Sequence, residues 1–525
     1  MRTVDLFDGY FWFQGVLYRS LSEDLFPQVC NPAVFSTTLK EFNGSFRFVI
    51  DCDDYIFAAV DRIRSFPLFY IQKGTEFFID SDAFELKKHS ANLDLDKLNI
   101  TEFLLTAYTC MNDTLYPEIK QLEAGQFLIW HKSEARLELR DYYVYQHLFE
   151  PIEYPLEAMD QMHKHIIQRL IDSAQNRTLV IPLSGGYDSR NIAYMLKRAG
   201  YANVICFTYG KSYDGDCSIS RKVAKFLNFP WIMVENTRSM WYEAFHSEEM
   251  LQFFRYGTNL SSSFHVQDWL AVKILKEREL IPTDAIFVPG HSGGAIQGQY
   301  LPMIFENRDK MDSKEFIQTI LKDFYNLWEY PIEKLYNLFN ERIRSYLKIP
   351  DILLTEIAAS FYDEYAWRQR ESKFIVNFVR VYEFFNYEWR IPLWDNEIME
   401  FWQRIPVSQR MHRQLYKEYV QKYQPIPVPV YHDYSFARRI KNKYARIVVG
   451  NIMTLAYGRF LDYKNRDAYL NTTISSILVP DLYYPEFINP ELPILKAQIN
   501  GIQALIYIKE LVSGNLDKLS LSKQI

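Results

Sequence analysis

The chain has few cysteines, no excess of basic residues and no long apolar run. Its 525 residues include only 5 cysteines, scattered and without a CxxC pair, so neither a disulfide framework nor a zinc site is indicated. Lys and Arg number 59 against 65 Asp and Glu, giving a net charge of -6, which argues against nucleic acid as a partner. No stretch of about 18 apolar residues and no signal-like N-terminal segment is present. We therefore expect a cytoplasmic protein with no membrane partner.

The rest of the composition is that of a folded globular chain. Hydrophobic residues make up 48% and charged residues 24% of the sequence, which excludes wholesale disorder. A chain of this length exceeds one hydrophobic core, so several domains are expected. The character of the sequence changes near residue 150, and we predict one domain over residues 1–150 and a second over residues 151–525.

The first part of the chain has the pattern of antiparallel strands. Short β-branched and aromatic runs occur at Phe46–Ile50, Tyr55–Val60 and Gln126–Trp130, separated by turn residues. The turn Cys52–Asp54 joins two of these runs and predicts a hairpin. The segment Leu98–Leu105 is the best candidate for a helix within this β-rich region.

The second part of the chain alternates strands and helices. A strand at Thr178–Leu183, a helix with an apolar face and a strand at Val204–Thr208 form a βαβ pattern, which further strands at Trp231–Val234 and Ala285–Val288 extend. The pattern predicts a doubly wound parallel α/β sheet. Residues 313–423 look mostly helical, and four apolar side chains there are expected in the core: Phe374, Phe378, Val381 and Phe385.

A short loop between the first strand and helix of this pattern has the features of a phosphate site. Ser184-Gly185-Gly186-Tyr187-Asp188-Ser189 lies where a parallel strand ends and a helix begins, so that backbone N–H groups and the helix dipole face an anion. The glycines let the main chain approach phosphate oxygens, and the hydroxyls add donors. Asp188 would repel phosphates unless Mg²⁺ lies between them.

The simplest alternative is a plain Gly-Gly turn. Five specified residues in this order arise by chance in on the order of one chain in a thousand, and the flanking strand and helix favour a functional loop. The segment resembles the SGGxDS loop of enzymes that cleave ATP between the α and β phosphates. The chain lacks the GxxxxGK[ST] pattern of γ-phosphate transfer, which argues against a kinase or motor.

Three segments together resemble the asparagine synthetase family. Phe42–Phe48 and Ala59–Tyr70 resemble the NGxFAF…ARDxxGxxPLYY pattern of class II glutamine amidotransferase domains, and Glu388–Asp395 resembles ExRxPFLD. With Ser184–Ser189 they occur in the order of the family. The resemblance implies an N-terminal Ntn-hydrolase-like β-sandwich of the α+β class. It also implies a doubly wound α/β domain of the ATP pyrophosphatase type with a large helical C-terminal part.

One departure from the family concerns glutamine hydrolysis. Members that hydrolyse glutamine use an N-terminal cysteine, whereas Arg2 follows Met1 here and no cysteine precedes Cys30. We expect no glutaminase activity, because the nucleophile is absent. In this the chain is similar to the β-lactam synthetase branch.

A second departure concerns the metal. Gly290–Tyr300 aligns with GEGSDELFGGY, but Gly294 and Ala295 replace the acidic pair, and so the second Mg²⁺ carboxylate is missing. The resemblance implies that Leu183 and the loop contact ATP, that Pro289 and Gly290 line its adenine and ribose side, and that Asp188 binds Mg²⁺. Either a substitute ligand helps Asp188, with Asp214 and Asp216 the nearest candidates in sequence, or the site handles ATP poorly. A solvated loop is the simpler interpretation of Asp214 and Asp216.

Few cationic or basic residues in the C-terminal half match the family. Arg390, with Glu388 and Asp395, is a candidate catalytic residue, although an Arg–carboxylate bridge that joins the helical part to the sheet is an equal alternative. Lys417 matches a family helix weakly and is a further candidate. The catalytic lysine of the later RxKxGF segment has no counterpart in residues 425–436. His432 could replace it, but a surface histidine is the simpler interpretation.

The resemblance implies an ATP-dependent ligase that activates a carboxylate as an acyl-adenylate. An amine or ammonia would then capture the acyl group, and ATP and Mg²⁺ would be the cofactors. One alternative is an amide-forming or cyclising ligase acting on a specialised sugar acid or peptide. Another is a catalytically silent binding scaffold, suggested by the loss of the cysteine and of the acidic pair. The sequence identifies neither substrate and leaves the oligomeric state open.

Overall fold

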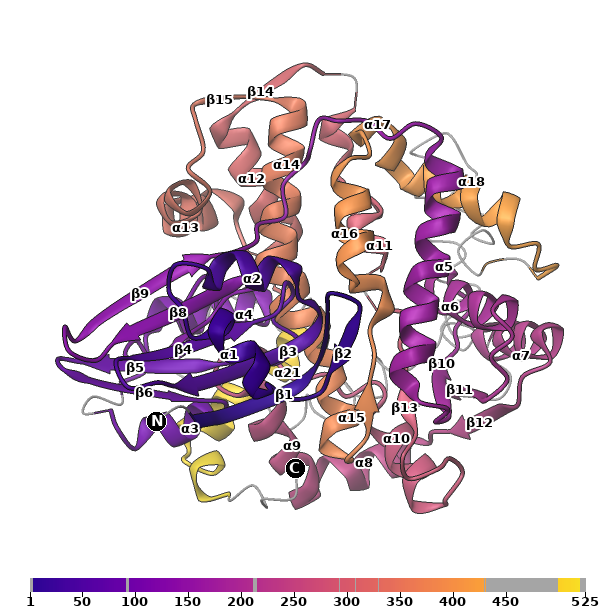
Figure 1. Cartoon of the computed structure of the whole chain (residues 1–525), viewed down its shortest axis with the longest axis horizontal. Helices are drawn as coiled ribbons and strands as arrows, with labels where there is room; N and C mark the ends of the chain where they lie inside the picture. The colour runs from indigo at the N-terminus through magenta and orange to yellow at the C-terminus, as the bar shows by residue number, and fades with distance from the viewer. Residues whose placement is uncertain are drawn as a thin grey trace.

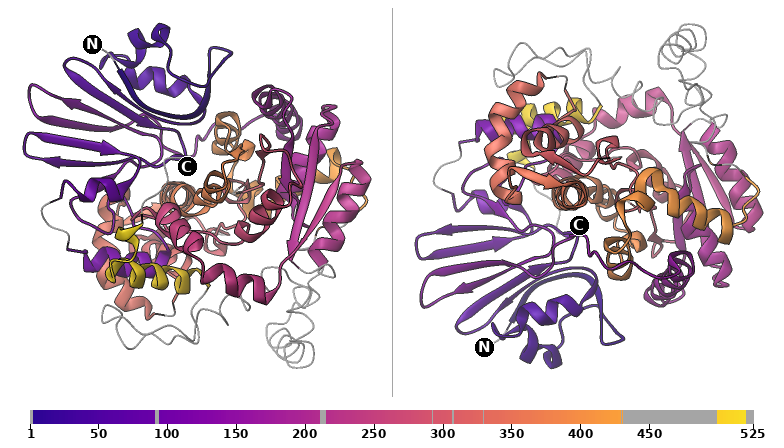
Figure 2. Two further views of the ribbon diagram at one scale, coloured as in Figure 1. Left: turned by 90° about the horizontal axis from the view of Figure 1, so that it is seen from below. Right: turned by 90° about the horizontal axis from the view of Figure 1, so that it is seen from above.

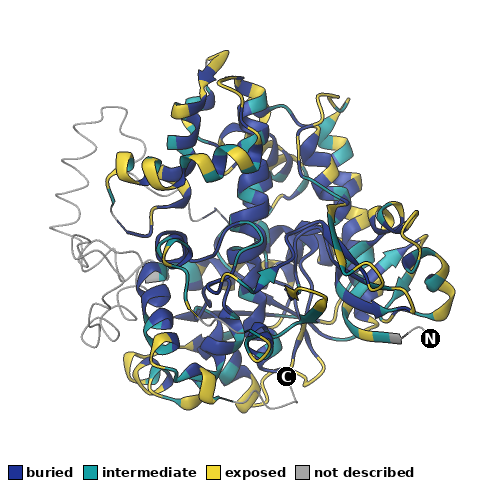
Figure 3. Ribbon diagram, turned by 90° about the vertical axis from the view of Figure 1, so that its left-hand side faces the viewer, coloured by how far each residue is buried: buried dark blue, intermediate teal, exposed yellow. Residues whose placement is uncertain are grey.

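The computed structural model describes residues 3–90, 94–210, 215–291, 293–306, 308–328, 330–428, 430 and 499–519. Within them, an antiparallel β-sandwich lies on one side of the molecule, a parallel sheet lies on the other, and helices fill the space between (Figures 1 and 2). The helices in the centre of the molecule are largely buried (Figure 3). No described helix is long and apolar enough to cross a membrane.

The sandwich consists of a six-stranded sheet and a three-stranded sheet. The first has the order β2-β1-β3-β4-β8-β9, from β1 (Thr3–Phe13), β2 (Val16–Tyr18), β3 (Asn43–Asp51), β4 (Tyr55–Val60), β8 (Gln126–His131) and β9 (Arg136–Asp141). The second has the order β6-β5-β7, from β5 (Phe69–Lys73), β6 (Glu76–Asp80) and β7 (Lys120–Gln121). The predicted strands and the β3–β4 hairpin are confirmed.

Helices complete the layers of the sandwich. They are α1 (Phe26–Val29), α2 (Phe35–Glu41), α3 (Ala83–Lys87) and α4 (Lys97–Thr106), the last confirming the predicted helix. Val49, Leu68 and Leu128 belong to the core between the two sheets, and Phe35 packs edge-on against Phe57 on the opposite face. The predicted sandwich of the α+β class is therefore confirmed.

The parallel sheet has the order β12-β11-β10-β13-β16. Its strands are β10 (Leu179–Pro182), β11 (Val204–Gly210), β12 (Trp231–Glu235), β13 (Ile286–Phe287) and β16 (Glu388–Trp389), all paired in parallel. Connecting helices are α5 (Pro155–Ala174), α6 (Tyr187–Arg198), α7 (Gly215–Leu227), α8 (Arg238–Phe245), α9 (Glu248–Thr258) and α10 (Trp269–Glu277). The strand order reverses between β10 and β13, so the predicted doubly wound sheet is confirmed.

The helical part begins after the short α11 (Gly293–Ile296). It contains α12 (Ser313–Phe324), α13 (Ile332–Leu347), α14 (Thr355–Tyr365), a π-helix (Ala366–Ile375), α15 (Arg380–Phe384), α16 (Asn396–Gln403), α17 (Val407–Arg410) and α18 (Gln414–Tyr423). The antiparallel pair of β14 (Lys310–Asp312) and β15 (Ile352–Leu354), which α12 and α13 separate in the chain, was not predicted, because strands of three residues show no period. Phe374, Val381 and Phe385 are buried as expected, and Phe378 is half-buried.

The two halves of the chain share packing. The last described α-helix, α21 (Ile499–Val512), packs against α4 of the N-terminal part, and Lys87 pairs with Asp517, beyond the end of α21, at 2.6 Å. The Tyr507 hydroxyl of α21 also accepts from Leu260 N, in the second half of the chain, at 3.3 Å. The last strand of the sandwich ends at Asp141, and α5 begins at Pro155. One large core contains side chains from both halves, and the division at residue 150 stays a prediction.

Candidate functional site

The loop Ser184–Ser189 lies at the carboxyl end of β10 and opens α6. Gly186 is the N-cap of this helix and provides no side chain to cap the first N–H groups. The loop lies at the switch point between β10 and β13, where open α/β sheets bind ligands. The predicted combination of parallel strand, glycine-containing turn and helix is therefore present.

Hydrogen bonds within the loop hold it in a curled conformation. Ser184 N donates to Ser189 Oγ at 3.1 Å, the two hydroxyl oxygens are 3.1 Å apart, and Gly186 N donates to Ser184 Oγ at 3.2 Å. Gly185 N donates to Asp216 Oδ1 at 2.8 Å, so that a carboxylate lies against one backbone donor of the loop. Asp216 was one candidate for the substitute metal ligand. Its carboxylate instead accepts a hydrogen bond from the loop, as a bound anion would.

The segment after β13 packs directly against the loop. A Cβ atom at Gly290 would lie 2.6 Å from Ser189 N and 3.0 Å from the carbonyl carbon of Asp188, so only glycine permits this approach. The structure therefore brings Gly290, and with it Pro289, to the predicted nucleotide site. Leu183 is fully buried beside the loop, and its backbone N donates to Phe207 O at 2.9 Å.

Arg413 is the cation of this site. Its Nη2 donates to Asp188 Oδ1 at 2.6 Å and also to Gln297 Oε1, and its Nη1 donates to Gln299 Oε1 at 3.2 Å. The guanidinium carbon lies 4.6 Å from the ring centroid of Tyr416 and 5.5 Å from that of Tyr187. Burial works to lower the pKa of Arg413, but the Asp188 carboxylate outweighs it and raises the pKa above its ordinary value.

Arg413 is held at the start of α18 in an unusual conformation. Its φ angle is 58°, in the left-handed region that non-glycine residues rarely adopt, and the preceding residue His412 has φ 57°. Such strain persists where surrounding contacts fix the side chain, as the ion pair to Asp188 does here. The conformation directs the Arg413 side chain to the loop, whereas Lys417, one turn later, is exposed.

Two buried donors beside this ion pair have no partner in the described part of the chain. They are Arg413 Nε and Gln297 Nε2, and Gln297 itself is fully buried. A buried N–H group without an acceptor costs free energy, of the order of 1–3 kcal/mol. The site thus presents hydrogen-bond donors, which fit an anion better than a metal ion.

The residues at Asp188 do not fit Mg²⁺. The ion requires several oxygen ligands, but Asp188 Oδ1 is bound by a guanidinium, and Gln297 and Gln299 turn their oxygens to the same cation. The described residues contain no group of three or more His, Cys, Asp or Glu that could hold a metal. A divalent ion next to Arg413 would also meet like charge. In this arrangement Asp188 binds a guanidinium, and its role as a metal ligand stays a prediction.

The structure does not bring Glu388 and Arg390 to the loop. Glu388 pairs with Ile286, and Ile286 with Leu179, which places Glu388 level with a residue five positions before Ser184, roughly 16 Å along the strand. Arg390 donates through Nη2 to Glu388 at 2.9 Å and through Nε to Ser173 Oγ at 3.2 Å. Both residues thus lie toward the amino end of the sheet, away from the loop, and their catalytic role stays a prediction.

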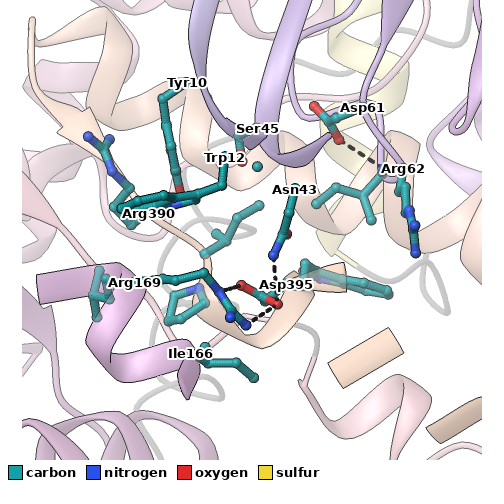
Figure 4. A pocket seen from close by; sticks show the side chains of 16 residues that line it. Tyr10, Trp12, Asn43, Ser45, Asp61, Arg62, Ile166, Arg169, Arg390 and Asp395 are labelled. Atoms are coloured by element: carbon teal, nitrogen blue, oxygen red, sulfur yellow. Dashed lines mark hydrogen bonds and ion pairs between the residues drawn. The ribbon is translucent and has the colours of Figure 1, made fainter. Parts of the chain in front are cut away.

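Arg390 and Asp395 instead line a small pocket between the sandwich and the parallel sheet (Figure 4). The Arg390 guanidinium carbon is 4.1 Å from the Tyr10 ring centroid, and Asp395 accepts a two-point contact from Arg169 at 2.8 Å. Asn43 Nδ2 donates to Asp395 Oδ1 at 3.2 Å. The cavity measures about 30 Å³, enough for a water molecule but too small for a metabolite. Two of the family-like segments therefore meet at an interface.

The remaining predicted residues are placed as follows. Lys417 lies on the exposed face of α18, and the structure provides no contact from it to the loop. Asp214 and His432 lie outside the described residues. Arg413, Gln297 and Gln299 were not predicted. One available signal was the pair of glutamines, which appears in the same segment that loses its acidic pair at Gly294 and Ala295.

One part of the chain matches a known protein family. A family model described as a glutamine amidotransferase domain matches residues 33–143, and no curated protein matches. An NH3-dependent NAD synthetase from Campylobacter jejuni in complex with the nitrate ion is 15% identical over 38% of this chain and 89% of its own, with a TM-score of 0.21.

Two further solved structures are similar to this chain over a smaller share of their own length. The glutamine phosphoribosylpyrophosphate amidotransferase from B. subtilis with ADP and GMP is 10% identical over 53% of this chain and 57% of its own, with a TM-score of 0.17. The allosteric regulatory enzyme of purine biosynthesis is 12% identical over 42% and 55%, with a TM-score of 0.18. Residues 33–143 are thus similar to a glutamine amidotransferase domain.

Proposed function

We propose that the chain is an ATP-dependent, AMP- and pyrophosphate-forming amide ligase of the asparagine synthetase type, without glutaminase activity of its own. The observation that carries this proposal is the curled Ser184–Ser189 loop at the switch point of the parallel sheet, facing a buried arginine. The amidotransferase match in residues 33–143 supports it, since the combination with a parallel sheet is the one the resemblance implies.

The reaction has two steps. A carboxylate oxygen of the acid substrate attacks the α-phosphorus of ATP, the bond to the bridging oxygen breaks, and pyrophosphate leaves with its electron pair. A neutral amine or ammonia then attacks the acyl carbon, AMP leaves with the former carboxylate oxygen, and the amine proton passes to solvent or a base. Products are amide, AMP and pyrophosphate.

Each part of the loop has a role in the first step. Backbone N–H groups at the start of α6 and the hydroxyls of Ser184 and Ser189 hold phosphate oxygens. The guanidinium of Arg413 neutralises charge that grows on the departing pyrophosphate. Asp216 must release Gly185 N when a phosphate oxygen replaces its carboxylate.

Exchange between pyrophosphate and ATP tests the proposal. Wild-type protein is incubated with labelled pyrophosphate, ATP and a panel of carboxylates that includes amino acids, sugar acids and peptides, with and without ammonia. We expect label in ATP with at least one acid, and AMP release only when an amine is added. ADP formation would contradict the proposed chemistry, because cleavage would then occur at the γ-phosphate. Ser189→Ala removes a loop hydroxyl and is expected to reduce exchange roughly tenfold.

A catalytically silent scaffold is the second candidate. It is favoured by the contacts that already occupy the loop, since Asp216 accepts from Gly185 and Asp188 is paired with Arg413. A scaffold would bind ATP without cleaving it, or would not bind it at all. Nucleotide binding measured by calorimetry beside the exchange assay separates these cases from the ligase.

A further inference from the structure

We propose that Arg413 and Gln297 bind a phosphate group of the nucleotide directly, so that a fixed guanidinium takes the place of a metal ion at Asp188. This inference rests on the proposed function and adds to it a property of the site: nucleotide binding at the loop does not require a divalent cation. It concerns the residues that contact the phosphates, and it leaves the identity of the acid and the amine open.

The first support is the donor set. Arg413 is more than nine-tenths buried and Gln297 is fully buried, yet Arg413 Nε and Gln297 Nε2 have no acceptor among the described residues. Both belong to the cluster that holds Asp188, at the first turn of α6. A phosphate oxygen supplies the acceptor that both atoms lack, and arginine is well suited to phosphate because its donors are fixed in one plane.

The second support is a steric coupling between three positions. A Cβ atom at Gly294 would lie only 2.1 Å from Gln299 Oε1, and 3.4 Å from Arg413 Nη1. Any larger residue at position 294, an aspartate included, would therefore displace the glutamine that orients the guanidinium. An acid at position 294 therefore requires a shift of the Gln299 side chain away from its present contact with Arg413.

The third support is that the cation cannot easily move away. Tyr187 and Tyr416 lie against the guanidinium, at ring centroid distances of 5.5 and 4.6 Å, and Gln299 accepts from its Nη1 at 3.2 Å. A side chain held on several sides keeps its charge next to the α6 N-terminus, whether or not a ligand is bound. A metal ion would have to compete with this fixed charge for Asp188.

The test uses the wild-type full-length protein and ATP as the probe. Calorimetric titrations are made in EDTA and in millimolar Mg²⁺ at the same ionic strength. We expect the two dissociation constants to differ by less than about tenfold. Binding that is weaker in EDTA by more than about tenfold would overturn this inference but leave the proposed function standing. Absence of ATP binding under both conditions would overturn the proposed function and this inference together.

Variants locate the effect on the two donors. Gln297→Leu removes one donor with little change in volume and is expected to weaken ATP binding in EDTA about tenfold. Arg404→Met, which removes an exposed arginine paired with Glu150, is the matched control and should bind ATP like the wild type. Circular dichroism shows whether each variant is folded. A folded Gln297→Leu protein with wild-type affinity would contradict direct phosphate contact.

A triple variant offers the converse test. Arg413→Met, Gln299→Gly and Gly294→Asp together remove the guanidinium, relieve the clash and place a second carboxylate near Asp188. We expect ATP binding by this variant to require Mg²⁺, with at least about a tenfold difference between Mg²⁺ and EDTA. Equal binding in both conditions by the folded variant would show that Arg413 is not what makes the metal dispensable.

Discussion

Arg390 and Arg413 are both buried arginines paired with an acidic residue, but only Arg413 has a nitrogen without any partner in the described chain. Arg390 uses Nε, Nη1 and Nη2 on Ser173, Trp389 and Glu388. Arg413 uses its two terminal nitrogens, while its Nε has no partner in the described chain. An arginine whose three nitrogens all have hydrogen-bond partners has a structural role. An arginine with an unpaired nitrogen beside a phosphate-type loop indicates a ligand-binding site.

The largest effect is expected from Arg413→Met. The variant loses a charge-assisted contact to phosphate and leaves Asp188 unpaired next to the triphosphate, so ATP affinity should fall about a hundredfold, equivalent to about 2.7 kcal/mol. Calorimetry with ATP measures the change. The matched variant Arg390→Met should keep wild-type affinity while its thermal unfolding temperature falls. If the two variants lost ATP affinity equally, the distinction drawn between the two arginines would be wrong.

The next effect concerns the interface of Figure 4. Arg169→Met removes the two-point partner of Asp395, whose side chain is only 11% exposed, and should lower the free energy of unfolding by about 2–3 kcal/mol. Urea denaturation followed by fluorescence gives this value. ATP binding by the folded variant should be unchanged, and a specific loss of binding with full stability would place the interface pocket in the active site.

A smaller effect follows from Glu388 and appears only in acid. Burial raises the pKa of Glu388, but the hydrogen bonds from Arg177 and the charge of Arg390 outweigh it, and the pKa falls from 4.5 to about 2. A carboxyl whose folded pKa is depressed contributes stability that is complete above pH 4.5 and is lost as the pH falls toward 2. Urea titrations from pH 6 to pH 3 should show a weaker pH dependence for Glu388→Gln than for the wild type. Parallel curves would contradict the role of this ion pair.

The smallest effect is expected from Lys417→Met. Lys417 is exposed on α18, whereas the neighbouring Tyr416 is buried. ATP affinity should change by less than about twofold, and the free energy of unfolding by less than about 0.5 kcal/mol. A strong loss of pyrophosphate exchange in this variant would restore Lys417 as a catalytic residue.

The sequence predicted the architecture well because the architecture follows from local patterns. Strands such as Tyr55–Val60 and the strand–loop–helix unit around Gly185 carry their periodicity and turn residues within short segments. β16 escaped prediction because it is two residues long and exists only by pairing with β13. Its pairing is what places Glu388 and Arg390 at the amino end of the sheet.

The site was predicted only in part, because half of it is formed by tertiary contact. Ser184, Asp188 and Ser189 are adjacent in sequence, and their grouping shows in the motif. Arg413 lies 225 positions from Asp188 in the sequence, and the two side chains come together only in the fold. The left-handed backbone conformation of Arg413 is not predicted by any local sequence pattern. The family resemblance pointed to Glu388–Asp395, but a matching motif alone does not tell whether its side chains act in catalysis or in packing.

The most direct test of the account is a crystal structure of the protein with a non-hydrolysable ATP analogue that carries a methylene bridge between the α and β phosphorus atoms. We expect phosphate oxygens within hydrogen-bond distance of the backbone N–H groups of residues 185–189. The Asp216 carboxylate should be displaced from Gly185, and a phosphate should contact Arg413. Phosphates bound elsewhere, or an unchanged Asp216–Gly185 contact in crystals saturated with the analogue, would contradict it.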